Sequence, residues 1–180
     1  AEEGNVGLKN ELVDYLAAYN EVLQKSTPIG SKDSYYDLST HDVKGNPIPR
    51  NTANCYIISH PGYYKIPLVY GNAIKNGATN ANSYTSTLTD TYVLSHFKDH
   101  NEQNITDPWI EKTNGGANNG INGTKLIWAD EPNLVQWIGT GIVHNGGEAY
   151  LQFEVKKENI KNGNAVVAVM KDNVVVWSWH

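Results

Sequence analysis

The apolar residues near the N-terminus recur at helical spacing. Between positions 8 and 23 they are separated mostly by three or four positions, as on one face of an α-helix. The set comprises Leu8, Leu12, Tyr15, Leu16, Tyr19, Val22 and Leu23. Pro28 and Gly30 then end the pattern, because proline lacks a helix donor and glycine favours a turn. We predict an amphipathic helix that packs on the body of the domain; a stalk or a partner-binding helix is the alternative.

The pattern from position 26 to 70 predicts a connector and then a hairpin. Prolines and glycines among polar residues in 26–54 favour an irregular connector. Two short segments rich in β-branched and aromatic residues follow at 53–59 and 64–70, separated by the turn sequence His60-Pro61-Gly62-Tyr63. This arrangement predicts a β-hairpin. In its second strand, alternation places four side chains on one face: Tyr64, Ile66, Leu68 and Tyr70. Pro67 requires an edge position or a bulge there.

The middle of the chain is polar and poor in periodic signals. Residues 71–90 are rich in Asn, Thr, Ser and Gly, and Asn76-Gly77 is a turn signal, so we predict a long surface loop. Residues 92–100 fit a short helix or a short strand. Residues 114–123, with two Gly-containing pairs, form a predicted cluster of turns.

The last third of the chain carries the strongest strand signals. Five short apolar segments are separated by turn residues, at 124–128, 134–138, 149–155, 164–170 and 174–179. Lys171-Asp172-Asn173 predicts a tight hairpin between the last two, and the run 166–169 is typical of a strand buried on both faces. We therefore predict a mainly β fold: a two-sheet β-sandwich with an N-terminal amphipathic helix. The helix and its linker occupy 1–30 and the sandwich domain occupies 31–180.

Composition and charge exclude several classes of protein and of partner. The 180 residues suit one domain, and a charged fraction of 18% argues against a disordered chain. The formal net charge of -5 and the absence of a cluster of basic residues disfavour nucleic acid as a partner. The single cysteine excludes an internal disulfide. No apolar run reaches the length of about 20 residues that spans a bilayer.

Several longer strings resemble one family. They are Asp37-Leu38-Ser39-Thr40-His41-Asp42, the stretch from Asn51 to Ile58, and Pro61-Gly62-Tyr63-Tyr64 continuing through Pro67 to Ile74. Further strings are Ile105-Thr106-Asp107-Pro108, Leu126-Ile127-Trp128, the stretch from Gly163 to Val169, and Trp177-Ser178-Trp179-His180. Over residues 37–180 the chain resembles the fimbrillin-like surface proteins of gut Bacteroidetes.

The resemblance implies a secreted, cell-surface β-sandwich protein on the bacterial outer membrane exterior, often a lipoprotein with its anchor upstream. Adhesive or pilus-like roles are implied with it, but no active site. The N-terminal helix falls outside the resemblance. Similar proteins continue past Trp-Ser-Trp-His with another apolar strand, whereas this chain stops at His180. Two interpretations stay open: truncation, or a final strand supplied by a partner, as in donor-strand assembly.

Few residues suggest catalysis or metal binding. Cys55 could pair with His41, His60 or His144 as an activated thiol, but its apolar strand context predicts a buried, inert thiol. His96 and His100 have the spacing of two zinc ligands on a helix, but no third ligand is identifiable. Four acids could supply a glycosidase pair, which sequence alone cannot establish: Asp107, Asp130, Glu131 and Glu148. We predict no catalytic residues, no metal and no cofactor.

Aromatic residues are the most suggestive binding feature. Their flat faces stack on sugar rings and dominate protein interfaces, although core packing must be weighed first. Trp109 and Tyr84 lie in predicted loops, and Trp177 and Trp179 share one side of the last strand. We predict these four as ligand-binding residues of a non-enzymatic adhesin or pilus-like module that recognises a glycan, a host protein or another subunit. The alternative is a secreted hydrolase, either glycan-directed or with Cys55 as nucleophile.

Overall fold

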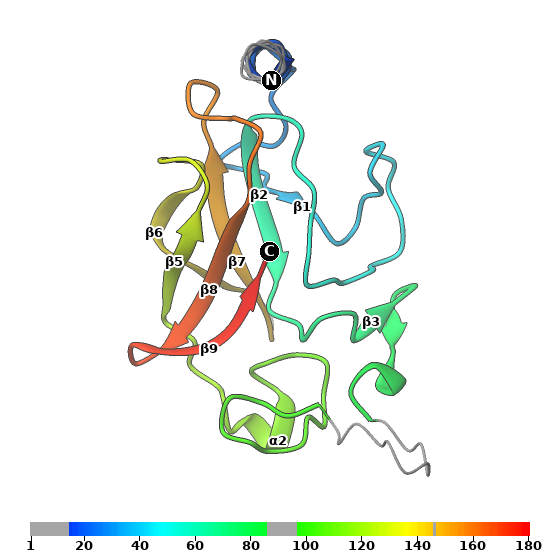
Figure 1. Cartoon of the computed structure of the whole chain (residues 1–180). Coiled ribbons are helices and arrows are strands. Elements are labelled where there is room, and N and C mark those ends of the chain that lie inside the picture. Colours follow the sequence, from blue (N-terminus) through cyan, green and yellow to red (C-terminus); the bar gives the residue numbers. More distant parts are fainter. Residues whose placement is uncertain (1–14, 86–96, 146) are drawn as a thin grey trace, which may run out of the picture.

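The chain folds into several β-sheets with little helix (Figure 1). The computed structural model describes residues 15–85, 97–145 and 147–180. Within them, one sheet has the strand order β1-β2-β7-β6, a second has the order β5-β8-β9, and β3 with β4 forms a small hairpin; none of these sheets closes. The strands are β1 (Tyr36–Asp37), β2 (Gly62–Pro67), β3 (Ile74–Lys75), β4 (Ala78–Thr79), β5 (Gly123–Ala129), β6 (Gln136–Asn145), β7 (Glu148–Val155), β8 (Ala165–Lys171) and β9 (Val174–Trp179). The prediction of a mainly β fold is confirmed.

One hydrophobic core joins the two larger sheets. It takes alternate side chains from β2, β7 and β8, because successive residues of a strand point to opposite faces, and two more side chains from β9. Its strand members include Tyr64, Ile66, Leu151, Phe153, Val167, Val169, Val176 and Trp179. The predicted alternation of the second hairpin strand is confirmed within β2, where Tyr64 and Ile66 are buried and Tyr63 and Lys65 are less so; beyond β2, Leu68, Val69 and Tyr70 are all buried and belong to no strand. Pro67 is accommodated as the last residue of β2.

The predicted β8–β9 hairpin is also confirmed. The bounds of β9 agree with the prediction, and β8 is shifted by one residue. Asp172 and Asn173 have φ values of 49° and 66°, so both central residues adopt the left-handed conformation that a two-residue type I′ turn requires. Residues 167–169 are buried, as the apolar run predicted. Asn76 and Gly77 form a similar turn between β3 and β4.

The predicted strand at 53–59 is wrong. This segment belongs to no strand, although its N-terminal part is extended beside the chain end: the His180 amide donates to the Asn54 carbonyl, and the Tyr56 amide donates to the His180 carbonyl. The reason lies in β2, whose two edges are already taken. β1 pairs with it in parallel on one side and β7 pairs antiparallel on the other. No edge of β2 is left for a hairpin partner.

Other boundaries differ where long-range pairing decides them. β6 is longer than predicted because it continues along β7 to Asn145, and β1 arises inside the predicted connector. The predicted loop at 71–90 contains β3, β4 and the 3-10 helix η1 (Ala81–Ser83), while residues 86–90 lie outside the described part. The short helix or strand predicted at 92–100 is not seen at 97–100, and residues 92–96 lie outside the described part. The turn cluster contains α2 (Thr113–Gly116), a single turn with left-handed residues.

In the described part of the N-terminal helix, contact with the body is made by the last turns. Residues 15–25 are helical, and the predicted positions 8–14 lie outside the described part. Leu23 is buried, but Tyr15 and Val22, on the predicted apolar face, are 67% and 65% exposed. The last turns are fixed by polar contacts, since the Asn162 amide donates to Asn20 Oδ1 at 2.7 Å. Packing on the body therefore holds only for the final turns, and Figure 1 shows the helix at one end of the molecule, opposite α2.

Buried tyrosines make the fold sensitive to alkali. Burial raises the pKa of Tyr56 and of Tyr70 from 10.0 to about 12. The folded state therefore holds these phenolic protons more tightly than the unfolded chain. Their contribution is fully present below pH 10 and is lost as the pH rises through about 12. We expect the free energy of unfolding, measured by urea titration, to fall between pH 10 and 12, and Tyr70→Phe to reduce that fall. A constant free energy across this range would contradict the expectation.

Candidate functional site

A groove runs along β9, the last strand of the β5-β8-β9 sheet. Within the described residues β9 is hydrogen-bonded to β8 on one side, and no strand pairs with its other side. The groove is lined by residues 175–180 together with Asn54, Val166 and the segment 98–100. The segment 54–56 is bonded to the end of this strand, through the backbone bonds of His180 to Asn54 and Tyr56 and through the bond of Trp177 Nε1 to Asn54 Oδ1. β5 and β6 also end their sheets, but the groove lies along β9, so its outer edge is the candidate place in the described fold for a further strand.

A tight turn places His100 on the wall of this groove. Asp99 is buried, and its Oδ1 accepts hydrogen bonds from the amides of Asn101 and Gln103, both at 2.9 Å. Its Oδ2 accepts from Asn118 Nδ2 at 3.2 Å, which anchors the turn to the segment after α2. An Asx turn of this kind is what an aspartate in a polar loop favours. The turn therefore holds residues 98–100 against the end of β9.

Within the described residues, two buried nitrogens of residues that line the groove have no hydrogen-bond partner. They are His100 Nδ1 and Trp179 Nε1, and both side chains line the groove. An unmade hydrogen bond on a buried polar group costs about 1–3 kcal/mol, so native proteins hold few of them. Finding both on one groove indicates a surface whose polar groups are incompletely satisfied within the described part of the chain.

The structure brings Trp177 and Trp179 together at this groove. Trp177 is half-buried; its Nε1 donates to Asn54 Oδ1 at 3.1 Å, and its ring meets Tyr70 edge-on at 4.9 Å. Trp179 is 2% exposed and belongs to the hydrophobic core. Tyr84 is also in the core, bonded through its carbonyl to the amide of Phe97. The ring centres of Phe97 and Trp177 are 5.9 Å apart.

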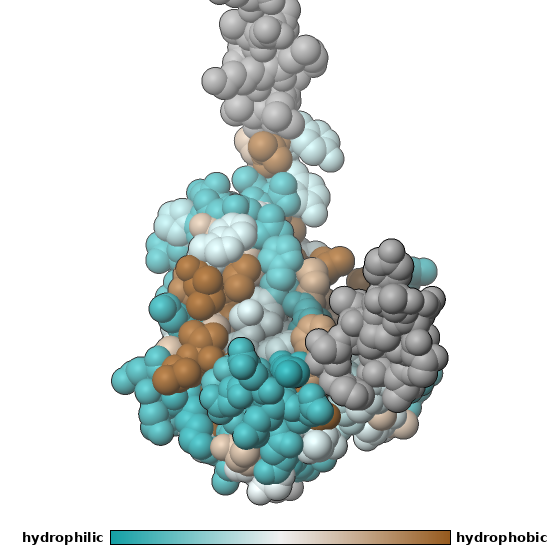
Figure 2. Space-filling view, turned by 60° about the horizontal axis from the view of Figure 1, so that its bottom comes forward, coloured by the Kyte–Doolittle hydropathy of each residue, from teal (hydrophilic) through white to brown (hydrophobic). Residues whose placement is uncertain are grey.

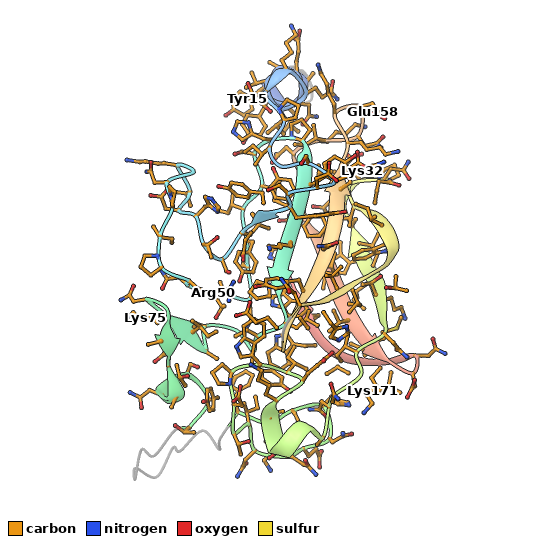
Figure 3. The ribbon with its side chains drawn as sticks, turned by 180° about the vertical axis from the view of Figure 1, so that it is seen from behind. Tyr15, Lys32, Arg50, Lys75, Glu158 and Lys171 are labelled. Carbon is orange, nitrogen blue, oxygen red and sulfur yellow. The ribbon has the colours of Figure 1, made fainter. Side chains whose placement is uncertain are left out.

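Trp109 lies in a separate cluster of aromatic rings and cations. The guanidinium carbon of Arg50 is 5.6 Å from the Trp109 ring centre and 5.7 Å from that of Tyr150. Lys112 Nζ is 5.4 Å from the Trp109 ring centre. Because cations within about 6 Å are attracted to aromatic rings, the Trp109 ring already interacts with Arg50 and Lys112 of the protein itself. Arg50 lies beside the end of β2 in Figure 3.

Cys55 is exposed, which contradicts the predicted buried thiol. Tyr56 and Ile58 pack against the core, whereas Cys55 and Ile57 alternate with them and point outward. Cys55 Sγ lies 3.7 Å from Nδ1 of His180, a histidine that the sequence had not paired with it. The three histidines proposed as partners have other contacts: His41 stacks on Tyr36, His60 contacts the Thr27 carbonyl, and His144 pairs with Glu111.

The predicted acids serve local structure. Asp107 Oδ1 accepts the Trp109 amide, Asp130 Oδ2 accepts the Asn164 amide, and Glu131 pairs with Lys161 at 3.5 Å. Glu148 accepts the Tyr150 hydroxyl at 2.6 Å, and burial raises the pKa of Tyr150 to about 12, so this hydroxyl stays protonated and donates. His96 lies outside the described residues. No group of three or more possible metal ligands occurs within them.

Further apolar surface lies on β5. Leu126, Ile127 and Trp128 are all exposed there. Figure 2 shows a largely hydrophilic surface with hydrophobic patches on the side where β5 and β6 lie in Figure 1.

Sequence reasoning missed Arg50 and the unpaired edge of β9. Arg50 is the only arginine in the chain, which was an available signal. The edge had no such signal, because strand order depends on pairing between distant segments.

Comparison with known proteins identified no relative of this chain. No protein-family model, curated protein or solved structure matches the chain. No helix in the described residues is both long and apolar enough to cross a membrane.

Proposed function

We propose that this chain is a non-enzymatic cell-surface module, built as a two-sheet β-sandwich, that assembles by accepting an extended strand from another subunit along β9. The observation that carries the proposal is the groove beside β9, where a strand edge has no paired neighbour in the described part of the chain. In β-augmentation, main-chain hydrogen bonds to such an edge supply affinity, and pockets for alternate side chains supply specificity.

Three further features support this proposal. Val174 and Val175 are exposed on β9, so an added strand would cover apolar surface there. Trp177, a predicted ligand residue, forms part of the groove wall and is enriched at protein interfaces as a residue type. The resemblance to fimbrillin-like proteins supports an exported, pilus-like or adhesive role.

Self-association tests the proposal directly. We expect sedimentation velocity to show association that increases with concentration, and amide hydrogen exchange to show protection of β9 in the associated form. Val175→Lys should weaken association about tenfold or more, because a charge on an edge strand opposes pairing. The matched control is Val143→Lys on β6, since Val143 is 38% exposed and Val175 is 37% exposed. A strictly monomeric chain, or equal effects of the two variants, would refute assembly through β9.

Surface location is tested separately. We expect antibodies against the folded domain to label intact cells of the source bacterium, and external protease to remove the label. Labelling that requires permeabilised cells would contradict a cell-surface role.

One observation favours a hydrolase as a second candidate. Cys55 and His180 are both exposed and in contact at 3.7 Å, as a thiol nucleophile and its base would be. If this pair were catalytic, Cys55→Ala would abolish hydrolysis of a panel of ester and glycoside substrates, and His180→Ala would do the same. Activity that survives Cys55→Ala would exclude the thiol mechanism.

A further inference from the structure

Asparagine followed by glycine recurs along this chain. In such a pair the backbone nitrogen of the glycine can attack the side-chain carbonyl of the asparagine, because glycine has no Cβ to hinder the approach. The pairs are at 76–77, 114–115, 119–120, 122–123, 145–146 and 162–163. Residue 146 lies outside the described part, and the structure describes the other pairs completely. The reactivity of each pair depends on whether the fold leaves both groups free to meet.

Hydrogen bonds restrain the pairs at 76–77 and 114–115. The Gly77 amide donates to the Arg50 carbonyl at 2.9 Å, so the attacking nitrogen beside Asn76 is occupied. Asn114 Nδ2 donates to the Asn104 carbonyl at 3.0 Å, which fixes the side chain that would be attacked. Reaction at either pair therefore requires that the bond break first, through a local opening of the fold.

Asn122 is held at both ends of its side-chain amide. Its Nδ2 donates to Asp172 Oδ1, and its Oδ1 accepts the Asp172 amide, both at 3.0 Å. Asp172 belongs to the tight turn between β8 and β9, so this contact is anchored in the hairpin. Asn122 is exposed, but exposure alone does not free its side chain. The pair at 122–123 is thus the most firmly restrained of the described pairs.

Asn119 and Asn162 lack such restraints. Both residues are exposed, and neither side chain makes a hydrogen bond to another described residue. The amides of Gly120 and Gly163 also donate to no carbonyl in the described part of the chain. At these two pairs the reacting groups can meet without any opening of the fold.

Charge distinguishes these two unrestrained pairs. Lys171, the last residue of β8 and labelled in Figure 3, donates to the Ala117 carbonyl at 3.4 Å. Its Cε lies 3.9 Å from the position that a Cβ on Gly120 would occupy. At the other pair, Asp130 Oδ2 lies 3.5 Å from the corresponding position on Gly163. The reaction removes the proton of the glycine amide, so a neighbouring cation favours it and a neighbouring carboxylate opposes it.

We infer that Asn119 is the site at which this chain most readily undergoes spontaneous deamidation. The Gly120 nitrogen forms a bond to Asn119 Cγ and gives up its proton, and the side-chain nitrogen leaves with that proton as ammonia. Water then opens the cyclic imide at either carbonyl, which yields aspartate or isoaspartate. Both products place a new carboxylate near Lys171. This modification goes beyond the proposed assembly, since it requires no second subunit.

Incubation of the intact chain in mildly alkaline buffer tests the inference. Peptide mass spectrometry with electron-transfer fragmentation locates each aspartate and isoaspartate. We expect Asn119 to convert about tenfold or more faster than Asn76, Asn114 and Asn122, since those pairs must first break hydrogen bonds. Asn162 should rank second. Incubation in concentrated urea removes the restraints, so the rates at all these residues should then agree within about threefold.

A charge variant tests the part played by Lys171. Lys171→Gln should slow the conversion of Asn119 about threefold in the folded chain, because the neighbouring cation is lost. Lys125→Gln is the matched control, since Lys125 is exposed on β5, and it should leave the rate unchanged. In urea the two variants should react alike. Conversion of Asn119 no faster than that of Asn122 or Asn162 in the folded chain, or equal effects of the two variants there, would overturn the inference.

Discussion

Replacing Arg50 with methionine is expected to lower the free energy of unfolding by about 3 kcal/mol. Arg50 Nη2 lies 3.1 Å from Asp37 Oδ2, and the Asp37 side chain is only 9% exposed. Removing one partner of such a pair leaves a buried charge without compensation, which costs far more than the pair contributes. Arg50 also donates to the Tyr150 hydroxyl at 2.8 Å and to Ser39 Oγ at 3.1 Å. Its loss would therefore remove the side-chain bonds that connect the segment around Arg50 to residues 37–39 and to β7.

Urea unfolding followed by far-ultraviolet circular dichroism measures this effect. The double variant Arg50→Met with Asp37→Asn should recover part of the loss, since the stranded carboxylate is then neutral. Lys125→Met on β5 is the matched control; Lys125 is exposed and should change the free energy by less than about 0.5 kcal/mol. A loss below about 1 kcal/mol for Arg50→Met would mean that the buried pair is not needed to hold β1 against β2.

Replacing Gly62 with alanine is expected to destabilise the fold by about 3 kcal/mol or more. A Cβ at this position would overlap the Ile29 carbonyl oxygen and lie 2.8 Å from the carbonyl carbon. The obstructing atoms belong to the backbone, so they cannot rotate away as a side chain can. The added methyl group would therefore push β2 away from the Ile29 segment. The two hydrogen bonds that join Ile29 to Pro61 and Tyr63, both 2.9 Å, would be lost with it.

Gly123→Ala provides the matched control, because the nearest atom to its new Cβ is the flexible end of Met170 at 3.4 Å. We expect a change of less than about 1 kcal/mol for Gly123→Ala in the same urea experiment. Hydrogen exchange should also show faster exchange of the Tyr63 amide in Gly62→Ala. Equal stability of the two variants would contradict backbone contact at Gly62 as the cause.

The candidate sites show where sequence reasoning succeeded and failed. The aromatic content pointed to Trp177 and Trp179, and the structure places both on the groove of β9. The pattern around Cys55 misled, because an apolar run does not show which of its alternate side chains face the core: Tyr56 and Ile58 do, and Cys55 does not. The contact of Cys55 with His180 spans 125 positions, and no local pattern reports such a distance.

Local chemistry alone determined much of this protein. Alternation of side chains identified the buried face of Tyr64 and Ile66, and two turn residues determined the hairpin before β9, since both effects act between near neighbours. Only the tertiary structure decided the strand order, the exclusion of 53–59 from β2 and the unpaired edge of β9. These depend on which distant segments compete for one edge, and that competition is resolved by the packing of the whole chain.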